Sequence, residues 1–149
     1  MAGVFWSLLG VAAGVFIAFQ APINSQLSRA LGFPVAAAAL SFFVGAVVLA
    51  VVSTVLIRAQ GIQLDWQAPT PWLFVGGGCL GAAFVTSATI LVPRLGAAAL
   101  MAFMVSGQLL AGMIIDRFGL LGVAVREITL GRVAGAMALV AGALMIRLY

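Results

Sequence analysis

The stretch F-Q-A-P-I-N-S-Q-L-S-R-A-L-G-F-P-V-A-A-A-A-L-S-F-F-V-G, residues 19–45, begins where one long apolar run ends and finishes inside the next. It places Gln20, Asn24 and Gln26 close to hydrocarbon, around Pro22. Proline in a helix removes a backbone hydrogen bond, so the first helix is expected to kink or end near residues 18–20. Pro34 suits the first position of a second helix. The stretch therefore joins two predicted helices and carries polar side chains at their border.

The composition indicates an integral membrane protein. Of the 149 residues, 65% are hydrophobic and only 7% are charged, and the mean hydropathy is +1.30. A soluble domain of this length needs far more charge to cover its surface. Membrane lipids are therefore expected around most of the chain.

Five apolar runs are long enough to cross a membrane. A span needs about 20 mostly apolar residues, and its backbone groups must be satisfied within the segment, which favours helices. The predicted fold class is thus an all-α membrane protein, a single domain of residues 1–149 with five transmembrane helices. The approximate spans are 4–20, 35–57, 72–92, 97–115 and 130–148.

Several classes of function are disfavoured by what the sequence lacks. It has no histidine, and Cys79 is its only cysteine, so neither a metal site nor a cofactor is expected. No paired acids or activated nucleophile indicate an enzyme. The net charge of +4 comes from arginines at or near the ends of the spans, without a basic block for nucleic acid.

The first candidates for ligand contact are Gln20 and Asn24. They lie four residues apart, so they share one face if the helix continues past Pro22. Carboxamides in lipid cost free energy unless they find partners. They either bind a substrate or cap the carbonyls that the proline leaves free, and the sequence does not decide between these.

A second pair of candidates, Gln108 and Asp116, lies two turns apart on nearly one face of the fourth span. A glutamine in mid-span is a functional candidate by default, and the alternative is an interhelical hydrogen bond. Asp116 is the acid nearest to a span. It is a candidate for coupling, but an ion pair with Arg117 or Arg132 is the favoured interpretation.

The remaining site residues are weaker candidates. Three hydroxyl side chains within spans are added to the predicted substrate site, although such groups often bond to their own helix: Ser41, Thr86 and Ser106. Pairs of glycines four residues apart predict close helix packing. These are Gly10 with Gly14, Gly77 with Gly81, and Gly131 with Gly135.

The arginines bear on orientation. Five spans place four arginines on the side of the N-terminus and three on the other, a bias of 4 − 3 = 1. So small a bias does not set one orientation, and near-balance is expected for a chain that inserts both ways. Two opposed copies would form an inverted pair of the kind from which transporters build a midplane site. An antiparallel dimer is therefore our hypothesis.

Several motifs resemble the YdcZ-like family of short bacterial membrane proteins, part of the drug/metabolite transporter superfamily. The motifs are G-V-F-I-A-F-Q-A-P-I-N-S-Q-L, S-F-F-V-G, P-W-L-F-V-G-G-G-C-L-G-A, V-P-R-L-G-A-A and G-Q-L-L-A-G-M-I-I-D-R-F-G. The resemblance implies five-helix units in dual-topology homodimers, opposite-topology pairs or fused duplicates that mimic a ten-helix inverted repeat. It implies transport across the bacterial inner membrane. Gln20, Asn24, Gln108 and Asp116 match the family's polar signature positions.

One departure concerns coupling. Small multidrug exporters of the same superfamily rely on a glutamate in the first helix, and the first span here has no acid. A proton-coupled antiport through such a residue is therefore not expected. Asp116 is the only acid that could take the place of that glutamate.

The sequence thus predicts a transporter of a small polar or amphipathic metabolite or drug that works by alternating access across an antiparallel dimer interface. The partner is a second copy or a paired homologous subunit. One rival is a dual-topology dimeric channel lined by the same residues. The other is a structural or assembly protein whose amides hold the dimer together.

Overall fold

The computed structural model describes residues 2–149, and the regular secondary structure over these residues is entirely helical. Five of the described helices are long and apolar enough to cross a membrane, as predicted. The chain divides into two compact units, Met1–Val92 and Pro93–Tyr149. The expectation of a single five-helix domain therefore stays a prediction.

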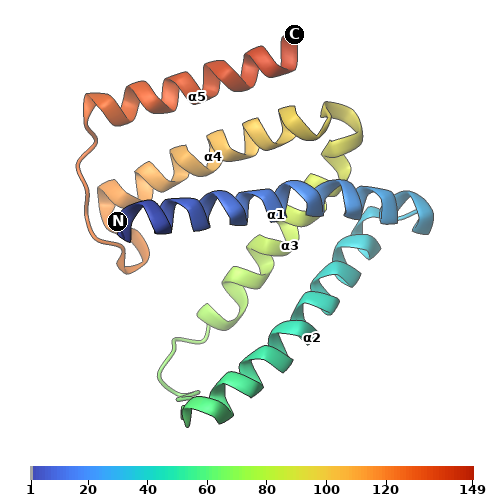
Figure 1. Cartoon of the computed structure of the whole chain (residues 1–149), viewed down its shortest axis with the longest axis vertical. Helices are drawn as coiled ribbons and strands as arrows, with labels where there is room; N and C mark the ends of the chain where they lie inside the picture. Colours follow the sequence, from blue (N-terminus) through green and yellow to red (C-terminus); the bar gives the residue numbers. More distant parts are fainter. Residues whose placement is uncertain (1) are drawn as a thin grey trace. The chain divides into compact units, whose positions relative to one another are not determined.

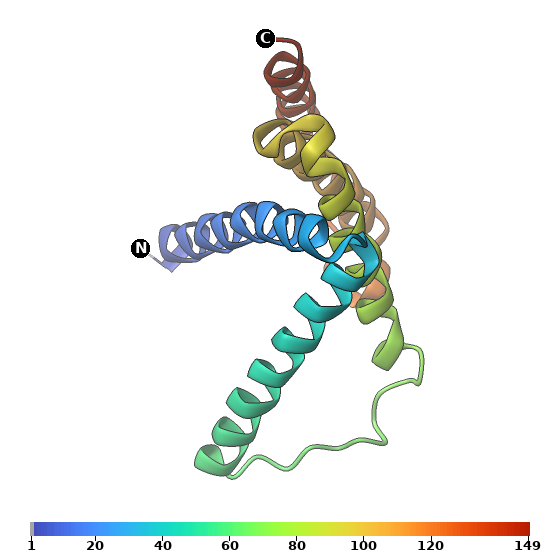
Figure 2. The same cartoon turned by 90° about the vertical axis from the view of Figure 1, so that its right-hand side faces the viewer.

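The first unit contains α1 (Ala2–Leu31), α2 (Pro34–Gln60) and nearly all of α3 (Leu73–Leu95). α1 and α2 pack together, and Figures 1 and 2 show them meeting at a tight turn and diverging away from it. Gly32 makes this turn with a φ of 74°, a left-handed conformation that glycine adopts without steric cost. Pro34 begins α2, as its position predicts.

The structure corrects the expected end of the first helix. α1 does not stop near residues 18–20 but continues through Pro22 to Leu31, well past the predicted span of 4–20. Proline removes one hydrogen bond and crowds the carbonyl four residues earlier, but the remaining ladder on both sides stays intact. Gln20 and Asn24 therefore lie on one continuous helix, four residues apart.

The second unit contains α4 (Ala97–Phe118), a short 3₁₀ turn η1 (Leu120–Gly122) and α5 (Leu130–Leu148). α4 and α5 pack along one another, joined by a loop at one end (Figure 1). α4 ends at Gly119, whose φ of 61° lets its N–H bond to the carbonyl of Ile115. α5 begins at the Thr129 cap, whose side chain accepts from the N–H of Arg132.

The other helices cover the expected spans with small differences. α2 and α4 extend about one turn further at their C-terminal ends, α3 is shifted toward the C-terminus, and α5 has the expected bounds.

The buried core is small. Only 6–17% of the most apolar window of each helix is buried inside the chain, so most of the helix surfaces face outward. The buried apolar residues are mostly alanines, joined by Val85 and Leu100. A membrane helix with this little internal contact presents its remaining surface to lipid or to another subunit.

Candidate functional site

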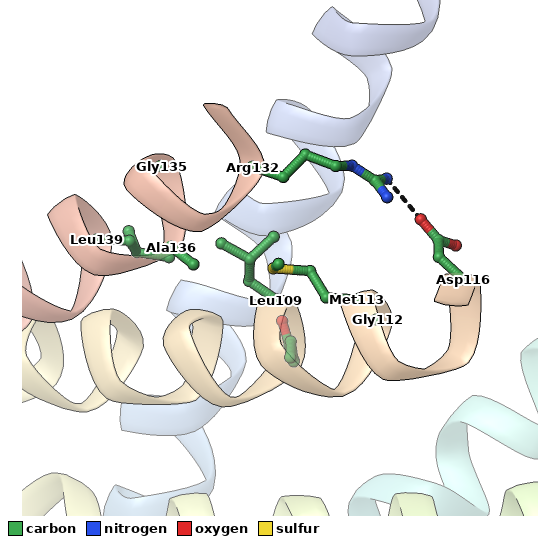
Figure 3. Close-up of a pocket in the computed structure, with 9 residues that line it drawn as sticks. Leu109, Gly112, Met113, Asp116, Arg132, Gly135, Ala136 and Leu139 are labelled. Atoms are coloured by element: carbon green, nitrogen blue, oxygen red, sulfur yellow. Dashed lines mark hydrogen bonds and ion pairs between the residues drawn. The ribbon is translucent and has the colours of Figure 1, made fainter. Parts of the chain in front are cut away.

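A groove lies between α4 and α5, within the second unit, and Figure 3 shows the residues that line it. Its volume is about 560 Å³, which falls within the roughly 300–1,000 Å³ typical of small-molecule sites. Most of the lining is apolar or glycine, with an amide and two charged side chains. The lining residues are Gln108, Leu109, Gly112, Met113, Asp116, Arg132, Gly135, Ala136 and Leu139.

An ion pair between the two helices forms one edge of this groove. Nη2 of Arg132 donates to Oδ2 of Asp116 at 2.6 Å (Figure 3). The two side chains are 33% and 23% exposed, so the pair is shielded from solvent without being sealed. Of the two arginines that the sequence offered, the structure selects Arg132 and not Arg117.

The same two residues anchor the loop that connects the helices. Nη1 of Arg132 donates to the carbonyl of Glu127 at 3.4 Å, and the N–H of Arg126 donates to the carbonyl of Asp116 at 2.8 Å. Asp116 and Arg132 therefore connect the end of α4, the start of α5 and the loop between them. Disturbing the pair would loosen the loop and the edge of the groove together.

The helix dipoles do not favour the positions of these two charges. Asp116 is in the last turn of α4, at the negative end of the helix dipole. Arg132 is in the first turn of α5, at the positive end of that dipole. Each charge is disfavoured by its own helix, by about 0.3–1 kcal/mol for a typical exposed position. Their mutual attraction, and any role in binding, must offset this cost.

Gln108 stands at the middle of its span. Eleven residues of α4 precede it and ten follow it. Its side chain is exposed within the chain, and it lines the same groove as Asp116, two turns further on. Within the described residues its amide forms no hydrogen bond with another helix, so this carboxamide, at the middle of α4, is free to bind another group.

The polar residues of α1 have a different environment. Asn24 is 3% exposed, and its Nδ2 has no hydrogen-bond partner in the described part of the chain. It therefore does not cap a carbonyl freed by Pro22. Gln20 is exposed. The next residue, the buried Ser25, accepts a hydrogen bond from Nη1 of Arg29, one turn further along the helix, at 3.2 Å.

The three weaker candidates do not line the α4/α5 groove. Ser106 is buried, and its hydroxyl donates to the carbonyl of Ala102 on its own helix at 2.8 Å. Ser41 and Thr86 are half-buried on α2 and α3. Their role in ligand contact stays a prediction.

The glycines differ in what surrounds them. A Cβ added at Gly81 would lie 3.0 Å from the Phe42 ring, so this glycine of α3 makes room for the Phe42 side chain of α2. Gly131 has only the hydroxyl of the neighbouring cap residue near it. Open space lies beside the other four, Gly10, Gly14, Gly77 and Gly135.

Sequence reasoning missed part of the site. Arg132 was considered as a partner of Asp116 but not as a residue of the site, and the apolar wall from α5 was not foreseen. One signal was available, since an arginine in the first turn of an apolar helix opposes the helix dipole and needs a partner. No group of three metal-ligating side chains occurs among the described residues.

The model of the family described as "Putative inner membrane exporter, YdcZ" matches residues 5–145, nearly the whole chain. No curated protein and no solved structure matches the chain. The chain belongs to this YdcZ family, and it is a multi-pass inner-membrane protein of a transporter family, not of an enzyme family.

Proposed function

We propose that this member of the YdcZ exporter family moves a small polar or amphipathic molecule by alternating access, with the α4/α5 groove as part of its transport site. The observation that carries the proposal is the combination in one groove of the mid-span amide of Gln108 with the Asp116–Arg132 pair. Polar groups in a membrane span are costly and usually mark a substrate path.

The position of Gln108 along α4 is compatible with an antiparallel dimer. A two-fold axis in the membrane plane maps the midplane of one copy onto the midplane of the other. Because Gln108 is at the middle of α4, the two copies of this residue would lie at the same depth. The Asp116–Arg132 pairs would lie at opposite membrane surfaces, one beside each opening of an alternating-access path.

The surface of the chain also supports assembly. Little of each helix is buried within the chain, and the glycines with open space beside them offer faces for close approach by another helix. The nearly balanced arginines permit insertion in both orientations. Gln20 and Asn24 remain proposed ligand contacts on the basis of the sequence.

The test is ligand binding by the purified full chain. Thermal unfolding is measured against a panel of amino acids, amines, organic acids and amphipathic drugs, for the native protein and for Gln108→Leu. A ligand at 100 times its dissociation constant adds about 2.7 kcal/mol of apparent stability. The matched control is Gln60→Leu, at the exposed end of α2.

The expected result is a hit that Gln108→Leu weakens and Gln60→Leu leaves unchanged, together with saturable uptake of that compound by proteoliposomes. A Gln108→Leu protein that loses its dimer while no compound binds the native protein would overturn the proposal in favour of an assembly role. Unitary conductance in planar bilayers would overturn it in favour of a channel.

A further inference from the structure

We infer that the α4/α5 groove takes small amphipathic zwitterions, molecules with an apolar body and with an ammonium and a carboxylate group at the same end. This inference rests on the proposed function, since it names the substrate class of the groove assigned to transport there. It follows from the spare hydrogen-bonding capacity of the ion pair and from the apolar wall beside it.

The Asp116–Arg132 pair is not saturated. A guanidinium group has five N–H donors, and Arg132 uses two of them, one toward Oδ2 of Asp116 and one toward the carbonyl of Glu127. In the described residues the other carboxylate oxygen of Asp116 accepts no hydrogen bond. Both side chains line the groove and are partly exposed, so a ligand can reach them without breaking the pair.

Charge complementarity selects the head group. A cation beside Asp116 also meets the positive charge of Arg132, and an anion beside Arg132 also meets the carboxylate, because the two charges are only 2.6 Å apart. A zwitterion in the opposite sense places its ammonium on Asp116 and its carboxylate on Arg132. Every charge is then paired, and this matters more in a partly shielded site than in bulk water.

The rest of the groove suits a short apolar body. Leu109 and Met113 extend from α4 toward α5, where Ala136 and Leu139 face them (Figure 3). Gly112 and Gly135 take up little room on the two helices, and the volume of about 560 Å³ fits a small molecule. The inferred occupant is therefore a small zwitterion with a short apolar body.

The experiment compares four probes that share one aliphatic chain and differ in charge. Isothermal titration of the full chain in nonionic detergent uses norleucine as zwitterion, pentylamine as cation, hexanoate as anion and hexanamide as neutral probe. Two charge-assisted hydrogen bonds should make norleucine bind at least about tenfold tighter than any of the other three. Equal affinities, a preference for another probe, or no binding of norleucine would overturn the inference.

Substitutions in the pair should change the preference in opposite directions. Asp116→Asn leaves the positive charge and should favour hexanoate, whereas Arg132→Gln leaves the negative charge and should favour pentylamine. The swapped variant Asp116→Arg/Arg132→Asp keeps a pair and should restore the preference for norleucine, so it decides the question if a single variant does not fold. Single variants that keep the native order of affinities would contradict the inference.

A zwitterionic lipid headgroup also carries an ammonium and an anionic group. A second experiment therefore distinguishes a soluble ligand from a lipid. The titration is repeated in nanodiscs of phosphatidylglycerol and of phosphatidylethanolamine. Unchanged norleucine affinity in both supports a soluble substrate, whereas loss of binding in phosphatidylethanolamine alone would assign the groove to lipid. Binding of hexanamide that depends on Gln108, without preference for norleucine, would refute this inference and leave the proposed transport function standing. Norleucine that binds as expected but is not transported would refute the transport function instead.

Discussion

The amide of Asn24 in α1 is almost fully buried and its Nδ2 has no partner, whereas the amide of Gln108 in α4 opens onto a groove beside the Asp116–Arg132 pair. Both helices are apolar, and both residues became candidates for the same reason, a carboxamide side chain in or beside an apolar run. Burial separates them. A buried amide without a partner costs folding free energy, while an accessible amide can bind a ligand or a second copy. The role of a polar residue in a membrane span can therefore be assigned only when its burial and its hydrogen-bond partners are known.

The largest effect is expected from Asp116→Asn, which breaks the ion pair with Arg132 beside the accessible amide of Gln108. Losing the charge should lower the free energy of unfolding by about 1–3 kcal/mol, between the values for exposed and buried pairs. It should also loosen the loop and abolish saturable uptake. Denaturant unfolding and proteoliposome uptake measure the two effects.

The matched control for that substitution is Asp65→Asn. Asp65 accepts the N–H groups of Gln67 and Ala68 in an exposed turn and takes part in no ion pair of the described structure. It should change stability little and leave uptake intact. Equal losses in the two variants would show that the Asp116–Arg132 pair has no special role.

The next largest effect is expected at the buried amide of Asn24. Asn24→Leu replaces an unpartnered buried amide by an apolar side chain of similar size, so the free energy of unfolding should rise by about 1 kcal/mol or stay unchanged. Chemical denaturation of the detergent-solubilised protein measures this change. A loss of more than about 1 kcal/mol would mean that the amide finds a partner in the assembled protein.

A smaller effect separates glycines that meet a helix of their own chain from those that do not. Gly81→Ala brings a methyl group against the Phe42 ring and should cost about 1 kcal/mol, since a packed contact must shift. Gly77→Ala, on the same helix, faces open space and should leave folding unchanged. If Gly77→Ala weakens the dimer in crosslinking assays while Gly81→Ala does not, the open face is an assembly surface.

The smallest effect is expected at two buried hydroxyls, one in each unit. Thr89 and Ser106 each donate to a carbonyl of their own helix at 2.8 Å. Thr89→Val and Ser106→Ala should each change the free energy of unfolding by at most about 1 kcal/mol, because both remove only a local bond. Ligand titration is the second readout. If Ser106→Ala lowers ligand affinity and Thr89→Val does not, Ser106 is part of the transport site.

The sequence by itself determined the fold class. Five apolar runs with few charges can only be satisfied in lipid as helices, so the number of spans and their approximate positions follow from composition and length. The turn at Gly32 and the start of α2 at Pro34 also follow from local conformational preference. At Pro22 local preference predicted a kink or an end of the helix, and the structure rules out the end, because α1 continues through the proline.

Tertiary structure decided which polar residues share a site. Gln108 and Asp116 could be placed on one helix face from their spacing, but the choice of Arg132 over Arg117 depended on how α5 packs along α4. The burial of Asn24 and the exposure of Gln20 were likewise invisible in the sequence, although the residues are one turn apart. Helical periodicity indicates which side chains share a face, and only packing between helices determines whether that face is closed or open.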